Sequence, residues 1–282
     1  MRSLSRSHPL CCFVYLIAVL GVTIFTREPL LLLMSVIGAS LLLTLSGMAR
    51  HTAWLPVIVI ASAVINPIFS HRGDTVLFFV GDLAVTLESV IYGAVFGLML
   101  AAAAGWSIAA TKYMTSDKYI WIFGRIVPTS GLVLSCGLRL VPLFIRRTRE
   151  FSSASGEAGV KSSLKSFSAA VGYSAEQAMM SADSMRARGY GTARRTSYSL
   201  YRFGLSEGFQ LCAITLLFAA AVTLMCFGAG KFEFYPALSD IGAQPPDIAL
   251  YAVFGVLCVM PSAAIIYEKI RRSRIPAVVK EH

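Results

Sequence analysis

The residues best suited to chemistry are two arginines beside two glycines, within positions 184–191 of this 282-residue chain. A guanidinium group can hold a carboxylate through two parallel hydrogen bonds. Glycine often follows the last turn of a helix because it takes the left-handed backbone conformation without strain. The segment therefore suggests a helix that ends in Arg188 and presents it to a carboxylate of another protein. The segment reads Ser184-Met185-Arg186-Ala187-Arg188-Gly189-Tyr190-Gly191.

A simpler interpretation of Arg188 remains open at this point. If residues 175–189 form a helix, Ala175, Met179, Ala182 and Arg186 share one side of it. The negative end of the helix dipole favours a basic residue in the last turn, and basic residues are frequent in cytoplasmic segments of membrane proteins. Arg188 could then be a helix-capping residue and nothing more.

Other patterns with chemical meaning are scarce in this sequence. It has no phosphate-binding GxxxxGK[ST] motif, so we do not expect it to hydrolyse ATP itself. The six cysteines form no CxxC pair and the four histidines have no metal-ligand spacing, so we expect no bound metal or cofactor. The acidic residues show no spacing that links them to a nucleophile, which disfavours a membrane enzyme that acts, for example, on lipid.

The elements that position these residues are apolar. The chain is 56% hydrophobic and 14% charged, whereas a soluble domain has about 25% charged residues. A helix needs about 20 apolar residues to cross a bilayer. We therefore expect an all-α integral membrane protein with about five to six transmembrane helices and a cytoplasmic helical domain. The candidate spans are residues 9–25, 30–47, 53–69, 88–111, 206–229 and 247–267.

Basic residues predict the orientation in the membrane. If the N-terminus lies in the cytoplasm, the loops expected outside contain only Arg27, Arg72 and Lys231 of the 25 lysines and arginines. This is a strong positive-inside pattern. We expect a multi-pass protein of a prokaryotic inner membrane, with both termini in the cytoplasm. The net charge of +10 then reflects topology, and we expect no nucleic-acid partner.

The long basic segment between the fourth and fifth candidate spans is the expected cytoplasmic domain. Its apolar stretches predict helices that lie on the inner face of the membrane. Its Ser/Ala/Gly-rich part, residues 152–175, is either a flexible linker or a place where helices cross closely. The predicted domains are residues 1–111 (transmembrane), 112–205 (cytoplasmic coupling helices), 206–269 (transmembrane) and 270–282 (a basic cytoplasmic tail).

A short apolar run at residues 76–80 follows the third candidate span. It is too short to cross a bilayer as a helix. We interpret it as a re-entrant or interfacial piece, or as one strand of a small hairpin with residues 83–85.

The motifs along the chain resemble those of the transmembrane T component of energy-coupling factor (ECF) transporters, the EcfT/CbiQ family. Residues 87–93 are similar to the family's LEGLLYG stretch, and residues 138–143 to its RFIPL segment. Residues 184–191 are similar to AMEARGYG. The paired N-terminal spans and Asn66-Pro67 occur in the same order, so the resemblance covers nearly the whole chain.

The resemblance implies that two Ala-Arg-Gly motifs end two coupling helices and dock on ATP-binding-cassette ATPases. The second motif is intact as Ala187-Arg188-Gly189, with Arg186 beside it. The first aligns with Ala154-Ser155-Gly156, where serine replaces arginine and cannot make a bidentate charged contact. We therefore expect asymmetric docking, with Arg146, Arg147 or Arg149 in compensation.

The resemblance also implies a function. It predicts an energy-coupling subunit that links two ATPases, which bind ATP and Mg²⁺, to a small membrane protein (the S component) that binds a vitamin or a nickel or cobalt ion. The expected coupling surface comprises Arg139, Pro142, Leu143, Met179 and Ala182. The alternative is the permease of a conventional ATP-driven importer, which lines the substrate path itself. The few polar residues within the candidate spans disfavour that alternative.

Overall fold

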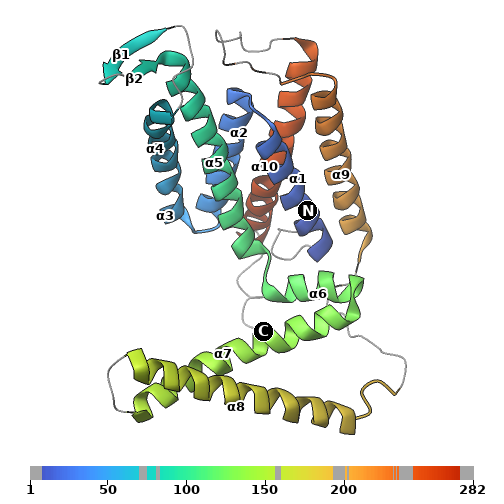
Figure 1. Cartoon of the computed structure of the whole chain (residues 1–282). Coiled ribbons are helices and arrows are strands. Elements are labelled where there is room, and N and C mark those ends of the chain that lie inside the picture. The colour runs from blue at the N-terminus through green and yellow to red at the C-terminus, as the bar shows by residue number, and fades with distance from the viewer. Residues whose placement is uncertain are drawn as a thin grey trace. The chain divides into compact units, whose positions relative to one another are not determined.

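The computed structural model describes residues 8–69, 75–80, 83–155, 160–192, 201, 203–230, 232, 234 and 244–273 (Figure 1). Most of these residues are helical, and one short β-hairpin is present. The chain divides into two compact units. The first unit joins Met1–Thr115 to Tyr201–His282, and the second is Ser116–Leu200.

The first unit contains seven helices and one hairpin within the described residues. The hairpin follows the fourth helix, and the last two helices come after the second unit in the chain. The elements are α1 (Pro9–Phe25), α2 (Pro29–Leu45), α3 (Ala49–Thr52), α4 (Trp54–Phe69), β1 (Val76–Val80), β2 (Leu83–Thr86), α5 (Leu87–Tyr113), α9 (Leu205–Cys226) and α10 (Pro245–Ser273).

Four segments of this unit are helical, long and apolar enough to cross a membrane: Ala49–Phe69, Leu87–Tyr113, Leu205–Cys226 and Pro245–Arg271. Helices α1 and α2 are also apolar, but each has only 17 residues. An all-α membrane protein fits these helices, because a spanning helix satisfies its own backbone groups in lipid. The number of spans remains a prediction.

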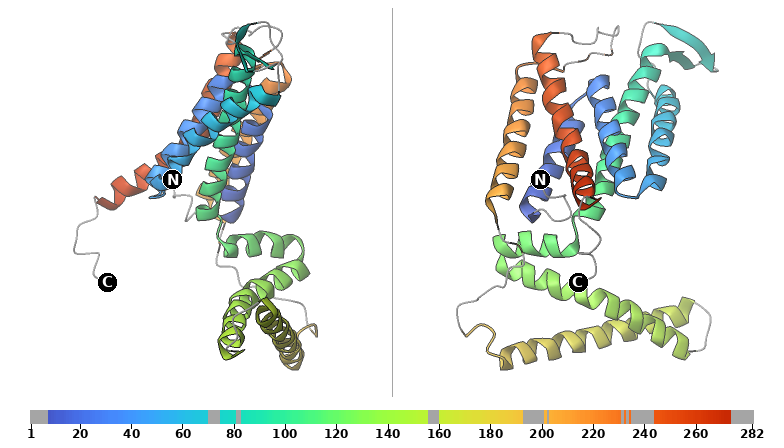
Figure 2. Two further views of the ribbon diagram at one scale, coloured as in Figure 1. Left: turned by 60° about the vertical axis from the view of Figure 1, so that its left-hand side comes forward. Right: turned by 180° about the vertical axis from the view of Figure 1, so that it is seen from behind.

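Five helices of this unit make a closed ring of contacts. Around the ring, α5 packs on α2, α2 on α10, α10 on α9, α9 on α1, and α1 on α5, while α4 packs on the outside of α5 (Figure 2). Several polar side chains inside the bundle bond to one another or to backbone groups. Trp106 Nε1 donates to Ser35 Oγ at 3.0 Å, and Ser35 Oγ lies 2.9 Å from Thr23 Oγ1.

Helices α4 and α5 approach closely because α5 presents glycine. A Cβ at Gly97 would lie 2.8 Å from Val59 Cα, and a Cβ at Gly93 would lie 3.1 Å from Ala63 Cα. Small residues four apart allow two membrane helices to bring their backbones together. The sequence predicts that α4 ends or kinks at Asn66-Pro67, but the helix continues to Phe69. Pro67 lies in its last turn and removes one backbone donor there, so the helix ends within two residues of the proline.

The short apolar run after α4 forms a strand. Strand β1 pairs antiparallel with β2, and Val80 lies opposite Leu83. The hairpin interpretation of this segment is therefore confirmed. Strand β2 leads directly into α5, where Thr86 Oγ1 accepts a hydrogen bond from Ser89 N at 3.4 Å and caps the helix.

The second unit consists of three helices within its described residues: α6 (Ser116–Ile126), α7 (Pro128–Ser155) and α8 (Val160–Ala187). Proline suits the first position of a helix, because its fixed backbone angle fits and its missing N–H is not needed there. Pro128 occupies this position in α7. Helix α6 packs on the first part of α7, and α7 crosses α8 (Figures 1 and 2).

The Ser/Ala/Gly-rich part of the sequence contributes to this crossing. Ser166 and Ala170 of α8 are buried, and Phe167 and Tyr173 beside them contact aromatic rings of α7. Close helix crossing is thus confirmed for this part of α8. Two predicted features fall partly outside the described residues. Residues 156–159 of the Ser/Ala/Gly-rich part and residues 274–282 of the predicted basic tail are not described. Residues 270–273 of the predicted tail still belong to α10.

Candidate functional site

Helix α8 ends in the way that its sequence predicts. Tyr190 N donates to Met185 O at 3.0 Å, and Gly189 N donates to Arg186 O at 2.9 Å. These two bonds define a Schellman motif, which satisfies the last carbonyls of a helix. Gly189 takes a φ of +79°, which favours glycine because it has no Cβ. The motif fixes the position of Arg188, the residue between the last helical turn and this glycine.

Arg188 is exposed at this helix end. Arg186, Ala187 and Gly189 are exposed as well, so the whole predicted docking motif lies on the surface of the second unit. Within the described part of the chain, Arg188 makes no ion pair. A charged group that is fixed at its backbone, and that has no ion-pair partner among the described residues, is available to an acidic group of another molecule.

The crossing of α7 and α8 holds this helix end in place. Phe144 packs edge-on against Phe167 with ring centres 5.5 Å apart, and Phe151 packs against Tyr173 at 6.5 Å. Such edge-to-face pairs are a preferred aromatic geometry. The crossing lies near the start of α8, so Arg188 stands about 25 Å along the helix from it, given a rise of about 1.5 Å per residue.

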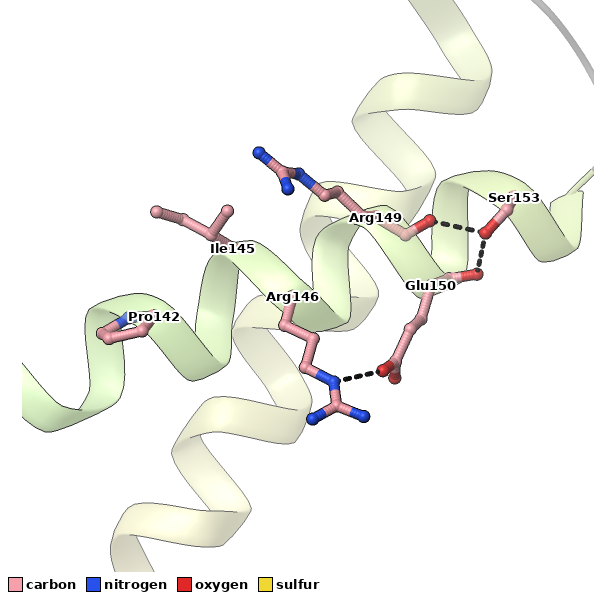
Figure 3. Close-up of a pocket in the computed structure, with 6 residues that line it drawn as sticks. All are labelled: Pro142, Ile145, Arg146, Arg149, Glu150 and Ser153. Atoms are coloured by element: carbon pink, nitrogen blue, oxygen red, sulfur yellow. Dashed lines mark hydrogen bonds and ion pairs between the residues drawn. The ribbon is translucent and has the colours of Figure 1, made fainter.

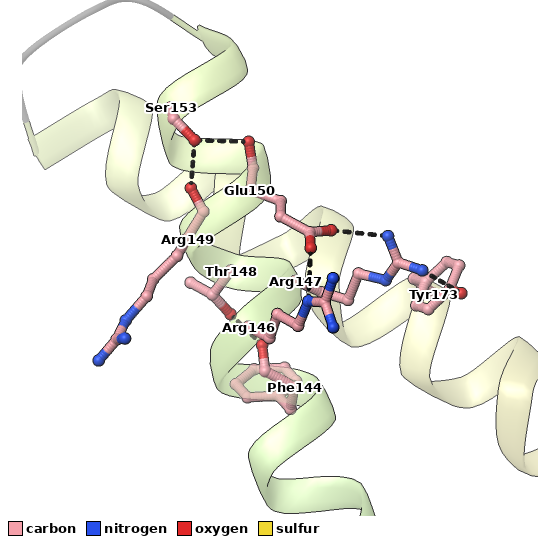
Figure 4. A network of polar contacts seen from close by, with 8 residues as sticks. All are labelled: Phe144, Arg146, Arg147, Thr148, Arg149, Glu150, Ser153 and Tyr173. Atoms are coloured by element: carbon pink, nitrogen blue, oxygen red, sulfur yellow. Dashed lines mark hydrogen bonds and ion pairs between the residues drawn. The ribbon is translucent and has the colours of Figure 1, made fainter.

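A polar cluster reinforces the crossing (Figure 4). The Arg147 guanidinium carbon lies 4.6 Å from the ring centre of Tyr173, and Arg147 Nη2 donates to Tyr173 Oη at 3.0 Å. Arg147 Nη1 also donates to Glu150 Oε2 at 2.6 Å, while Arg146 Nε donates to Glu150 Oε1 at 2.9 Å. One carboxylate therefore holds two arginines, and one of these arginines reaches across to α8.

The contacts within this cluster shift the pKa values of Glu150 and Arg147. Hydrogen bonds from Arg146 and Arg147 lower the pKa of Glu150, because they favour its charged form. The hydrogen bond to Glu150 and its negative charge raise the pKa of Arg147. Glu150 thus stays ionised at neutral pH and keeps both arginines oriented.

An open hollow of about 400 Å³ lies along α7 beside this cluster (Figure 3). Its floor combines apolar side chains with the arginines and Glu150. It is lined by Pro142, Ile145, Arg146, Arg149, Glu150 and Ser153. The side chain of Arg149 is exposed there. The hollow therefore offers a partner both an apolar contact and positive charge.

The first predicted motif lies at the end of the other long helix. Ala154 and Ser155 are the last two residues of α7, although the structure describes their backbone and not their side chains. Gly156 lies outside the described residues. Residues of both predicted motifs thus occupy the C-terminal ends of the two crossing helices.

The predicted coupling surface is divided between the same two helices. Arg139 and Pro142 of α7 are exposed and Leu143 is half-buried, while Met179 and Ala182 of α8 are exposed. In chain order, the three residues of α7 come before its contacts at the crossing, and the two residues of α8 come after them. Apolar side chains around them are also exposed, including Val141 of α7 and Met180 of α8.

Arg147 was predicted only as a compensating arginine at the docking site, and its contacts with Glu150 and Tyr173 were not predicted. Arg146 and Arg147 stand four and three residues before Glu150, and this spacing could have predicted both ion pairs. Tyr173 gave no comparable signal, because its contact with Arg147 depends on how α7 and α8 cross. Comparisons with known proteins supply no guide here, since no family model and no curated protein matches the chain.

Proposed function

We propose that this chain is the energy-coupling transmembrane subunit of an ECF-type importer in a prokaryotic inner membrane. It binds no ATP itself. Two ATP-binding-cassette subunits, with their ATP and Mg²⁺, dock on the second unit, and a small S component carries the vitamin or the nickel or cobalt ion. The observation that carries the proposal is Arg188, which is exposed and backbone-fixed at the end of the long helix α8.

The geometry of the second unit supports this role. Two long helices are joined at one crossing by aromatic rings and by Arg147, so a push on the end of either helix reaches the other. The exposed apolar side chains on the open side of the crossing suit a membrane-embedded partner. Between residues 116 and 200 the sequence has 12 lysines and arginines against five aspartates and glutamates, which suits acidic docking grooves.

The two helix ends differ in charge, which supports asymmetric docking. Helix α8 offers Arg188 directly after its last residue, while the corresponding residue at the end of α7 is Ser155. On α7, the nearest exposed arginines are Arg149 and Arg146, which lie about two turns before the helix end and beside the hollow. We propose that the ATPase at this end binds through the hollow and its arginines.

The test is to purify the tagged full-length chain from the membranes of its native host in mild detergent and to identify its companions. We expect two ATPase subunits and one very hydrophobic protein, with ATPase activity only in the complex. A chain that accumulates a solute in vesicles without any companion would contradict the proposal and favour a self-sufficient transporter.

A further inference from the structure

A buried carboxylic acid lies at the turn between α1 and α2, far along the chain from the docking motifs. Glu28 is the residue before Pro29, the first residue of α2, and only 1% of its surface is exposed. Its side chain does not cap α2. Charged side chains are almost never fully buried unless they are paired, so Glu28 requires an explanation.

Residues from three helices surround the Glu28 carboxyl group. Tyr251 of α10 donates a hydrogen bond from its hydroxyl to Glu28 Oε1. Glu28 Oε2 is buried and has no hydrogen-bond partner among the described residues. This oxygen faces the turn after α9, where a Cβ built on Gly230 would lie 3.3 Å from it. Glu28 therefore sits where the α1–α2 turn, the end of α9 and the start of α10 meet.

Among the described residues, the charge that acts on Glu28 is another carboxylate. Asp247, one turn before Tyr251 on α10, is buried and accepts hydrogen bonds from Gly230 N at 3.0 Å and Gln244 N at 3.3 Å. Each of its two side-chain oxygens therefore accepts a hydrogen bond from a backbone N–H group. Arg27 of the same turn is exposed and lines a separate apolar hollow with Tyr92.

Among the described residues, the remaining neighbours bring no positive charge to Glu28. Thr26 directs its hydroxyl to Met225 Sδ of α9, at 3.9 Å. No ion pair joins Glu28 to a cation within the part of the chain that the structure describes. An ionised Glu28 would thus be desolvated beside a like charge, and both effects disfavour the charged form. Burial, together with the charge of Asp247, raises the pKa of Glu28 to about 7.

We propose that Glu28 is a proton-binding site that fastens the α1–α2 turn to α9 and α10. When it holds a proton, the neutral acid stays in its buried position against Tyr251 and Gly230. When it loses the proton, the unpaired charge beside Asp247 loosens the junction. In the orientation that the loop charges predict, this junction faces the outside of the cell, so it responds to external pH.

The sign of the effect follows from the direction of the shift. The pKa of Glu28 is higher in the folded protein than in the unfolded chain, so the folded state binds more protons between the two values. The contribution of Glu28 to folding is therefore most favourable in acid and weakens as the pH rises toward about 7, by up to about tenfold in the folding constant per pH unit.

The experiment compares the full chain in detergent with Glu28→Gln, which imitates the protonated acid. We expect the unfolding temperature of the wild type to fall between about pH 5 and about pH 8, and that of Glu28→Gln to fall less and to exceed it at the upper end. The matched control is Glu88→Gln. Glu88 is also a buried carboxylate of this unit, but it accepts hydrogen bonds from Thr75, and its variant should keep the wild-type slope.

Two further measurements separate proton binding from a merely structural role. In infrared difference spectra across this pH range, a carboxylic-acid carbonyl band should appear in the wild type and be absent from Glu28→Gln. In Tyr251→Phe, which removes a hydrogen bond that favours the charged form, the same band should titrate at higher pH. Equal pH slopes in wild type and Glu28→Gln, or a band that persists in Glu28→Gln, would overturn the proposal. If Glu28→Gln does not fold, an unshifted band in Tyr251→Phe would also overturn it.

Discussion

Arg147 of α7 lies against the ring of Tyr173 of α8, with its guanidinium carbon 4.6 Å from the ring centre, and it also donates a hydrogen bond to the Tyr173 hydroxyl. This pair links two long helices that otherwise meet through a few aromatic and small side chains. Because the predicted docking motifs end these helices, the pair sets how the two ends are oriented to each other.

We expect Arg147→Lys to loosen the crossing, because an ammonium group cannot both lie flat on the ring and bridge Tyr173 and Glu150. Hydrogen exchange of the full chain should become faster in residues 166–173 of α8. Arg149→Lys is the matched control, since Arg149 is exposed on the same helix in the hollow. Equal protection in both variants would show that the pair contributes nothing to the crossing.

Acid should weaken the cluster around Glu150. The hydrogen bonds from Arg146 and Arg147 lower the pKa of Glu150 below its ordinary value. Its stabilising contribution is therefore complete above the unfolded-state value of about 4.3 and is lost as the pH falls through the lower folded-state value. The unfolding temperature measured down to about pH 3 should fall less in Glu150→Gln than in the wild type. Parallel curves for the two proteins would contradict this.

Arg188→Ala should weaken the binding of an ATPase partner without affecting insertion or folding. Loss of one member of a charged pair buried in an interface costs about 2–5 kcal/mol, which is roughly 30-fold or more in affinity. Lys165→Ala removes the same charge from an exposed position near the start of α8 and is the matched control. Co-purification from detergent-solubilised membranes measures the effect. Full assembly of Arg188→Ala would remove the main support for the proposed function.

Gly189→Ala should disturb the end of α8. Its φ of +79° is unfavourable for a residue with a Cβ by about 1 kcal/mol, so the Schellman motif should fray and Arg188 should lose its fixed position. Gly172→Ala lies in the same helix with open space around it, and alanine there should stabilise the helix by up to about 1 kcal/mol. Gly189→Ala should therefore lower the unfolding temperature and weaken partner co-purification. Gly172→Ala should raise the unfolding temperature or leave it unchanged, and it should leave co-purification unchanged.

Gly97→Ala should push α4 away from α5. The added Cβ would lie 2.8 Å from Val59 Cα and 3.0 Å from Val59 O, and backbone atoms cannot move aside. Overpacking of this kind costs about 1–3 kcal/mol. At Gly21 of α1, by contrast, a Cβ would make an ordinary contact with Phe218 at 3.6 Å. Gly97→Ala should thus lower the unfolding temperature in detergent, and Gly21→Ala should leave it nearly unchanged.

The sequence by itself was enough to predict features that depend on local chemistry. Apolar runs indicate helices that suit a bilayer, because lipid leaves the backbone no other way to satisfy its polar groups. The order of alanine, arginine and glycine at 187–189 predicted the helix end, since a positive φ at Gly189 is a property of one residue and its neighbours. A hairpin of residues 76–80 with 83–85 was one of the interpretations that the short apolar run allowed, and the structure shows this pairing.

Only the tertiary structure decided which distant residues meet. Tyr173 reaches Arg147 because two helices cross, and Tyr251 reaches Glu28 because α10 packs on α2, more than 200 residues later in the chain. No local sequence pattern predicts these contacts, because helix packing depends on the shapes of whole side-chain surfaces. The burial of Glu28, and with it the rise of its pKa, follows from that packing and from no property of the residue's own segment.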